Sequence, residues 1–153
     1  MAIGNEPWTE WAWGIPLIVL TVLIHVIGFG RIRRRVFQAA SHETQARHPE
    51  VVFVTVITLL TLLAICLHAL EAGIWAAAYR FLGALPDYRS AMLYSLNAIT
   101  SYGHTALSLD ERWRLMGAME SLNGWLLFGL STAFLFAVLV RVFSSLDRRD
   151  NRA

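Results

Sequence analysis

Residues 51–70 read VVFVTVITLLTLLAICLHAL, and up to residue 67 only Thr55, Thr58 and Thr61 interrupt the apolar side chains. An amphipathic helix of a soluble bundle would show a polar face that recurs every third or fourth residue. A membrane-spanning helix instead needs about 20 consecutive, predominantly apolar residues. We therefore expect this stretch to cross a membrane.

Two further stretches satisfy the same length requirement. Residues 13–29 carry His25 as their only ionisable side chain, and residues 115–143 carry Glu120 near their start. The chain of 153 residues is 56% hydrophobic and 16% charged, whereas soluble domains average about 45–50% and 25%. This composition excludes a disordered chain, and the lone Cys66 excludes a disulfide scaffold. The expected fold is an all-α membrane protein with three transmembrane helices.

The arginines predict how the chain is oriented, because cytoplasmic loops are enriched in basic residues. All thirteen basic residues are arginine, and residues 1–13 contain none of them. Nine lie on one predicted side: Arg31, Arg33, Arg34, Arg35, Arg47, Arg141, Arg148, Arg149 and Arg152. We therefore expect a multi-pass protein of the bacterial inner (plasma) membrane, with its N-terminus outside and its C-terminus inside. The acidic start argues against a cleaved signal peptide.

The Arg-rich connector 31–50 is expected to lie on the cytoplasmic side. Its cluster Arg31–Arg35 is suited to contact anionic lipid headgroups. The sequence pI of about 9.1 then reflects membrane topology, and we expect no nucleic-acid partner.

Residues 84–114 join the second and third spans and are neither a span nor an ordinary loop. A turn at Pro86 and Asp87 precedes RSAMLYSLNAIT (89–100), in which apolar residues recur at helical spacing but over too short a length to cross a bilayer. A polar turn containing Gly103 follows. Two interpretations are open. One is a re-entrant half-helix, whose irregular end must line a water-filled cavity or be buried in protein; the other is a helix lying on the outer surface.

The order of helix, half-helix, a turn with Thr100, Tyr102 and Gly103, and a further helix resembles the pore module of the potassium channel superfamily. Four TVGYG loops in that family supply the carbonyl oxygens that replace the hydration shell of the ion. The stretch 112–139, RWRLMGAMESLNGWLLFGLSTAFLFAVL, looks like the inner helix of small bacterial two-helix potassium-channel-like proteins. The outer helix of that group is similar at His68, Glu71, Trp75, Ala76 and Tyr79.

The resemblance covers about residues 51–143 and implies a homotetramer that conducts monovalent cations, most of all K⁺. Enzyme motifs are absent from the sequence, so we expect no enzymatic activity, and we expect no cofactor or metal beyond monovalent cations in the pore. Apolar length and the arginines predict three parts outside the resemblance: an N-terminal transmembrane helix (1–30), the connector (31–50) and a cytoplasmic tail (147–153). The resemblance implies a pore module (51–146) with outer helix 51–82, pore helix 89–99, selectivity filter 100–104 and inner helix 112–146.

The filter departs from the family pattern, because residues 100–104 read TSYGH. Ser101 stands where the first glycine belongs, and His104 stands where an aspartate follows. Glycine reaches a positive φ at little cost, so a serine there would be strained or the loop would form fewer ion sites. The alternative function is therefore a channel-like protein that is non-selective or non-conducting and acts as a scaffold or accessory subunit.

His104 has two possible roles at the outer mouth of such a pore. A ring of histidines would make conduction sensitive to pH between roughly 5 and 7, where imidazole titrates. The other possibility is a hydrogen-bonding strut behind the filter. Recordings at acidic and neutral outer pH distinguish the two.

Four residues of the outer and inner helices are candidates to support the filter: Glu71, Glu120, His68 and Trp75. Ionisable groups within spans usually face the protein interior. His68 and Glu71 share a helix face, but the spacing of the remaining His, Cys and Asp residues supplies no further metal ligands. Gly124 and Gly129 are candidates for a gating hinge, and simple helix packing is the other interpretation of these small residues.

Overall fold

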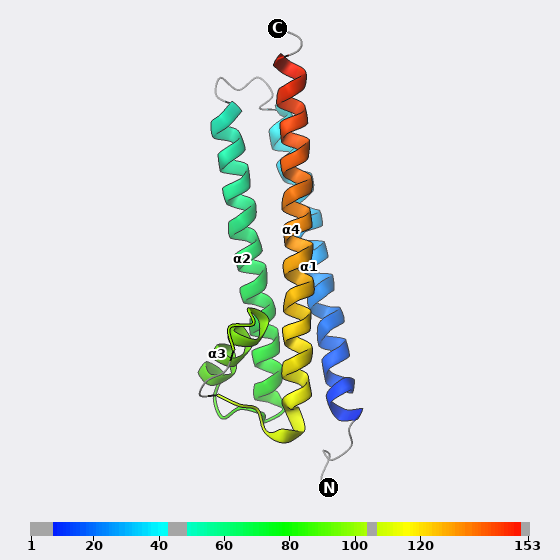
Figure 1. The fold of residues 1–153 in the computed structure, drawn as a ribbon, viewed down its shortest axis with the longest axis vertical. Coiled ribbons are helices and arrows are strands. Elements are labelled where there is room, and N and C mark those ends of the chain that lie inside the picture. The colour runs from blue at the N-terminus through cyan, green and yellow to red at the C-terminus, as the bar shows by residue number, and fades with distance from the viewer. Residues whose placement is uncertain (1–7, 43–48, 104–106, 151–153) are drawn as a thin grey trace.

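The computed structural model describes residues 8–42, 49–103 and 107–150, and within these ranges every regular element is helical. Three long helices form a bundle, and a short one packs at one end (Figure 1). The elements are α1 (Trp8–His42), α2 (Pro49–Phe81), α3 (Tyr88–Ile99), a 3₁₀ turn (Glu111–Trp113) and α4 (Arg114–Asp150).

The three long helices confirm the prediction of three transmembrane segments. The parts long and apolar enough to cross a membrane are Trp8–Ile32, Phe53–Phe81 and Glu111–Arg141. Their outward faces are apolar as well; Val54 is 60% exposed and Phe136 is 65% exposed. Soluble monomers rarely expose large contiguous apolar surfaces. The chain is therefore a membrane-embedded protein, with α1 beginning and α4 ending at opposite ends of the bundle (Figure 1).

The first helix is longer than its apolar stretch. The helical backbone of α1 continues to His42, ten residues past the end of the apolar segment at Ile32. The backbone of the cluster Arg31–Arg35 is therefore helical, and Arg47 lies outside the described residues. The helix α2 starts at Pro49, a residue that helices accept in their first turn because its missing N–H has no intrahelical partner there.

The short helix α3 begins where the sequence predicts it. Asp87 has an extended backbone, with φ of −145°, and its carboxylate accepts hydrogen bonds from the Ser90 amide at 2.9 Å and the Ser90 hydroxyl at 2.7 Å. An aspartate at this position satisfies one of the amides that a helix start leaves without a partner. The chain reverses direction between α2 and α3, and Gly83 supplies a positive φ of 67° in this turn.

The direction of α3 sets the geometry of the candidate site. From its start near the end of α2 it runs back beside α2, so that the Ser95 hydroxyl reaches the Ala72 carbonyl at 2.7 Å. Its last residue, Ile99, lies against Gly124, ten residues after the start of α4. At a rise of 1.5 Å per residue this corresponds to about 15 Å along α4. The C-terminal end of α3 is thus level with the interior of the last span.

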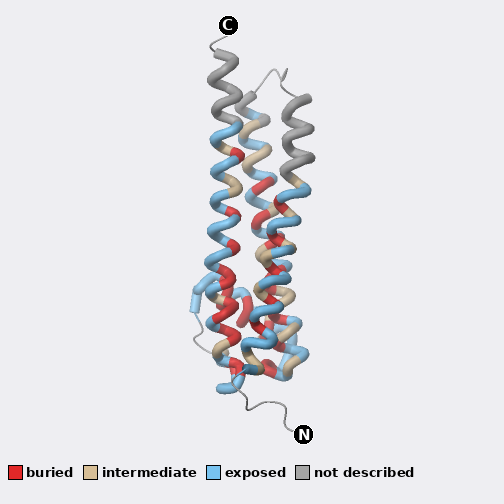
Figure 2. Tube along the Cα trace, turned by 90° about the vertical axis from the view of Figure 1, so that its right-hand side faces the viewer, coloured by how far each residue is buried: buried red, intermediate tan, exposed pale blue. Residues whose placement is uncertain are grey.

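A core of large side chains holds α3 in this place. Trp75, Tyr79 and Met116 are fully buried between α2, α3 and α4, and buried positions crowd the half of the bundle that contains α3 (Figure 2). The start of α1 contacts the start of α4 at the same end of the bundle, because the Glu10 carboxylate accepts a hydrogen bond from the backbone amide of Leu115 at 2.7 Å. An acidic group at a helix N-terminus also interacts favourably with the helix dipole.

Candidate functional site

The predicted filter begins as the capped end of α3. The amide of Ser101 donates to the Ala98 carbonyl at 3.0 Å, and the amide of Tyr102 donates to the Asn97 carbonyl at 3.0 Å. This pair of hydrogen bonds is the Schellman motif, which places its C′ residue in the left-handed conformation. Ser101 occupies that position with φ of 54°. Ser101, where the resemblance leads one to expect a glycine, is therefore the one non-glycine residue with positive φ among the described residues.

The residues of the turn are exposed in the single chain. Tyr102 is 84% exposed, and Thr100, Ser101 and Gly103 are exposed as well. Gly103 has φ of 94°, which also favours glycine. His104, the last predicted filter residue, lies outside the described residues, and both interpretations of its role remain predictions.

Trp125 of α4 holds the turn from the side. Its indole Nε1 donates a hydrogen bond to the Ser101 hydroxyl at 2.8 Å. Ser101 thus binds the following helix through a hydroxyl group that a glycine at this position would lack.

Glu120 connects α4 to α3 from within the core. Its fully buried carboxylate accepts from the Tyr79 hydroxyl at 2.8 Å and from the Ser95 hydroxyl. Ser95 belongs to α3 and also lies within hydrogen-bonding distance of α2. Glu120 therefore contacts the half-helix that carries the turn and not the turn itself, and its role as filter support stays a prediction with this geometry behind it.

Gly124 and Gly129 differ in their surroundings. A Cβ at Gly124 would collide with the backbone of Ile99, at the end of α3, whereas among the described residues no atom lies within 4 Å of a Cβ built at Gly129. Gly124 thus permits the close approach of α3 to α4, which is the packing interpretation of this residue. Gly129 has space on all sides.

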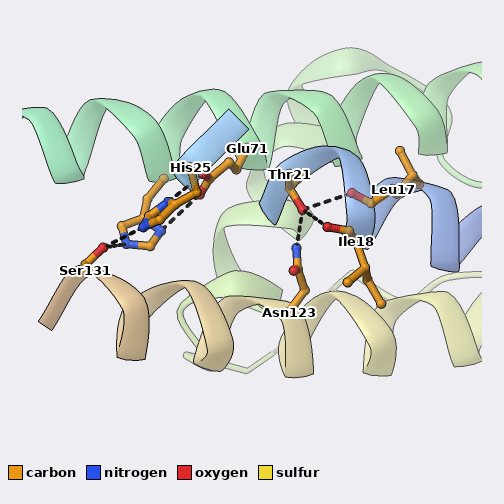
Figure 3. Close-up of polar contacts among 8 residues, drawn as sticks. Leu17, Ile18, Thr21, His25, Glu71, Asn123 and Ser131 are labelled. Carbon is orange, nitrogen blue, oxygen red and sulfur yellow. Dashed lines mark hydrogen bonds and ion pairs between the residues drawn. The ribbon is translucent and has the colours of Figure 1, made fainter. Parts of the chain in front are cut away.

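Four side chains from three helices close a ring of polar contacts further along the bundle. His25 Nδ1 lies 2.7 Å from Glu71 Oε1, and His25 Nε2 lies 3.0 Å from Ser131 Oγ. His68 Nε2 lies 3.2 Å from the same Ser131 Oγ, and His68 Nδ1 lies 3.3 Å from Glu71 Oε2. We call His25, His68, Glu71 and Ser131 the histidine ring. Figure 3 shows His25 between Glu71 and Ser131.

Two of the predicted filter-support residues, His68 and Glu71, belong to the histidine ring, and their role as filter support stays a prediction. Glu71 and His25 are fully buried and contact each other across α1 and α2. The side chain of His68 is 25% exposed. Trp75 is buried beside Tyr79, with ring centroids 6.0 Å apart, and its Nε1 has no hydrogen-bond partner among the described residues. None of the described polar contacts of Glu71 or Trp75 reaches the turn.

A second polar contact joins α1 to α4 and was not predicted. The Asn123 side-chain amide donates to the Thr21 hydroxyl at 2.8 Å, and Thr21 in turn donates to the Leu17 and Ile18 carbonyls (Figure 3). The one feature of the sequence that could have pointed to this region is His25, one helical turn beyond Thr21. An ionisable residue within a membrane span is a functional candidate by default. The partners of His25 could not be identified from spacing.

A pocket of about 490 Å³ is lined by His68 of the histidine ring and by Thr100 and Ser101 of the turn. It lies between α2, the end of α3 and α4. Its lining residues are Ile65, His68, Ala69, Leu96, Ile99, Thr100, Ser101, Gly124, Trp125 and Phe128.

No family model, curated protein or solved structure matches this chain. The function is therefore argued from the geometry of the site and from the resemblance in its sequence.

Proposed function

We propose that this chain is one subunit of a tetrameric channel that conducts monovalent cations, with K⁺ as the principal ion. The observation that carries the proposal is the placement of α3. Its C-terminal end lies against Gly124, about 15 Å along the last span. A half-helix that enters a membrane to this depth and then ends in a polar turn is the arrangement expected of a re-entrant pore helix.

The electrostatics of this placement favour a cation. The C-terminus of a helix carries a partial negative charge from its unsatisfied carbonyl groups. In α3 this end is the residue pair Ile99 and Thr100, held in place by the core below it. The carbonyl oxygens of Thr100 to Gly103 are the groups proposed to bind the ion, as carbonyl rings do in selectivity filters.

Four copies are required because one loop cannot enclose an ion path. In the single chain the turn exposes Thr100, Tyr102 and Gly103, so that these residues are available to other copies. The adjoining face of α4 is apolar and exposed as well, with Trp125 at 68% and Phe128 at 65%. We propose that the α4 helices line the inner cavity of the tetramer.

The membrane orientation follows the arginines. We propose a bacterial inner membrane location with the start of α1 outside and the end of α4 inside, which places α3 on the outer side. The arginines Arg31–Arg35 would then lie at the cytoplasmic headgroups, where each basic residue gains about 1 kcal/mol near an anionic surface.

The test is ion flux in liposomes that contain the purified chain, measured separately for K⁺, Na⁺ and an anion. We expect K⁺ flux that Gly103→Asp abolishes, because the substitution places a charged side chain at a residue with φ of 94° in the ion path. Ser108→Asp is the matched control, since Ser108 is exposed in the same outer segment, and it should conduct normally. Cation flux that Gly103→Asp leaves unchanged would rule out this turn as the filter.

A second candidate function is favoured by the hydrogen bond between Ser101 and Trp125. This contact fastens the turn to α4 and supports a channel-like scaffold or accessory subunit that does not conduct. A folded, tetrameric chain without flux of any ion would support the scaffold. Co-purification of a foreign protein at a fixed ratio would support the accessory subunit.

A further inference from the structure

The histidine ring leaves one buried carboxylate oxygen without a hydrogen-bond partner. Each neutral imidazole carries one N–H, the Ser131 hydroxyl carries one hydrogen, and an ionised carboxylate carries none. These three hydrogens account for the three hydrogen bonds of the ring. Glu71 Oε2 has no hydrogen-bond partner among the described residues and lies 3.3 Å from His68 Nδ1, which presents a lone pair to it when His68 donates from Nε2. Because His25 and Glu71 are fully buried, solvent cannot relieve that contact, and an unpaired buried polar group is costly.

Ser131 determines where such a cation would lie. Its hydroxyl oxygen is within 3.2 Å of Nε2 of both His25 and His68, so it can accept an N–H from each. Both Nδ1 atoms then present lone pairs to the Glu71 carboxylate. In metal sites a ligating histidine almost always donates its other ring N–H to a neighbouring acceptor, which fixes the tautomer. Ser131 occupies that position for both imidazoles.

We propose that the histidine ring binds a divalent transition-metal ion of the Zn²⁺ class through His25 Nδ1, His68 Nδ1 and a carboxylate oxygen of Glu71. One ligand atom from each residue lies within 4.8 Å of the others. Zinc binds such atoms at about 2.0–2.2 Å, which separates neighbouring ligand atoms of a tetrahedron by about 3.3 Å. His25 Nδ1 lies 2.7 Å from Glu71 Oε1 and His68 Nδ1 lies 3.3 Å from Glu71 Oε2. Both imidazoles therefore face the carboxylate, one at each oxygen, and a bound ion would require the side chains to adjust around a single oxygen.

The ligand types suit this class of ion. Imidazole favours zinc, copper, iron and nickel, whereas calcium and magnesium favour oxygen ligands. Two histidines and one carboxylate form a three-residue set that leaves the fourth position of zinc open to water or another ligand. The charge of Glu71 offsets part of the charge of the ion, which a buried site within a membrane span requires.

The pocket provides a route to the open position. His68 is the one member of the histidine ring on the pocket lining, and its side chain is 25% exposed. An ion entering from the pocket would meet His68 first and then the buried pair of His25 and Glu71. Because His25 belongs to α1 and the other two ligands belong to α2, the bound ion would fasten the first helix to the predicted pore module.

The experiment measures binding of Co²⁺ and Zn²⁺ to the full chain, independently of any flux. The protein is purified in detergent with a histidine-free tag, treated with a chelator and titrated with Co²⁺ by calorimetry and visible absorption. A Cys66→Ser background removes the only thiol. We expect one Co²⁺ per chain with the strong visible absorption of four-coordinate cobalt, and its loss when Zn²⁺ is added.

Substitutions within the ring test the assignment. His25→Gln and Glu71→Gln each remove a ligand and should weaken binding by more than the roughly 10–100-fold expected for loss of an orienting partner, as in Ser131→Ala. Glu120→Gln removes a buried carboxylate outside the ring and should bind normally. If a ligand variant fails to fold by circular dichroism, Ser131→Ala makes the same test with all three ligands present.

Two results would overturn the proposal. Unchanged affinity in folded His25→Gln and Glu71→Gln chains would place the ion elsewhere. Absence of Co²⁺ and Zn²⁺ binding to the folded parent chain would mean that the ring holds only a proton. Neither result depends on whether the chain conducts ions.

Discussion

The backbone of Ile99, the last residue of α3, lies directly against Gly124 of α4, so closely that a Cβ at residue 124 would collide with its carbonyl group. The C-terminal end of a short helix thereby reaches the interior of a membrane span. The contact depends on a missing side chain, and a hydrogen bond from Trp125 to Ser101 reinforces it one residue further along α4.

The first prediction compares two glycines of the same helix. Gly124→Ala should destabilise the chain by about 1–3 kcal/mol, the range for overpacking a close contact, and should displace the end of α3. Gly129→Ala meets open space among the described residues and should leave stability within about 0.5 kcal/mol of the parent. Equilibrium unfolding in mixed detergent micelles measures both. Equal losses in the two variants would contradict the close-approach role of Gly124.

The second prediction concerns the hydrogen bonds that the Glu120 carboxylate accepts from Ser95 of α3 and Tyr79 of α2. Hydrogen bonds between helices in membranes contribute about 0.6–2 kcal/mol each. Ser95→Ala and Tyr79→Phe should each cost about that amount, because each removes a donor to the buried Glu120 carboxylate. In a double-mutant cycle, Ser95→Ala should lose part of its effect in a Glu120→Ala chain, where the Ser95 hydroxyl keeps only the Ala72 carbonyl as a partner.

Ser121→Ala is the control for that cycle. The Ser121 hydroxyl donates to the Gly117 carbonyl of its own helix at 3.1 Å, so its loss should not couple to Glu120. Strictly additive effects of Ser95 and Glu120 would refute a shared contact.

The third prediction tests the left-handed backbone at Ser101. Valine at this position, with φ of 54°, should destabilise the helix end, because a left-handed conformation costs a non-glycine residue roughly 1–2 kcal/mol and a β-branched one more. Ser101→Gly removes that cost but also the hydrogen bond from Trp125, so its melting temperature should change little. If the chain is a channel, Ser101→Gly should also raise the preference for K⁺ over Na⁺.

Trp125→Phe distinguishes the contribution of the hydrogen bond to Ser101 from the cost of the left-handed backbone at Ser101. It removes only the hydrogen bond and should lower the melting temperature in the parent chain but not in the Ser101→Gly chain. A marked loss of stability in Ser101→Gly alone would show that the side-chain contact outweighs the backbone cost.

The fourth prediction is a pH dependence at the start of α3. Hydrogen bonds from the Ser90 amide and hydroxyl lower the pKa of Asp87. The folded-state pKa then lies below the unfolded value of about 3.9, so the stabilisation is present above that value and is lost as the pH falls through the folded-state pKa.

Amide hydrogen exchange of the first turn of α3 measures this effect. At acidic pH the protection should fall in the parent chain relative to Asp87→Asn, which keeps a capping side chain without an ionisable group. Identical protection in the two chains from neutral to acidic pH would show that the charge of Asp87 contributes nothing.

Much of the fold could be predicted because it depends on local properties of the chain. Apolar length alone identifies the spans, since a bilayer imposes the same requirement on every crossing segment. The start of α3 follows from the capping chemistry of Asp87. Ser101 has the positive φ that the resemblance leads one to expect at this position. The extension of α1 to His42 could not be read from hydropathy, because helix propensity continues beyond the apolar segment.

The sequence by itself thus determined a membrane protein of three spanning helices with a short helix between the last two. Only the tertiary structure decided which polar residues meet. His25 and Glu71 are 46 residues apart along the chain yet 2.7 Å apart in space, and Ser131 joins them from a third helix. Spacing identifies neighbours within one helix, but the rotation of a helix against its partners depends on packing along its whole length. Close packing of the helices therefore decided which side chains meet in the histidine ring. The approach of α3 to Gly124 likewise decided how far along α4 the turn after α3 lies.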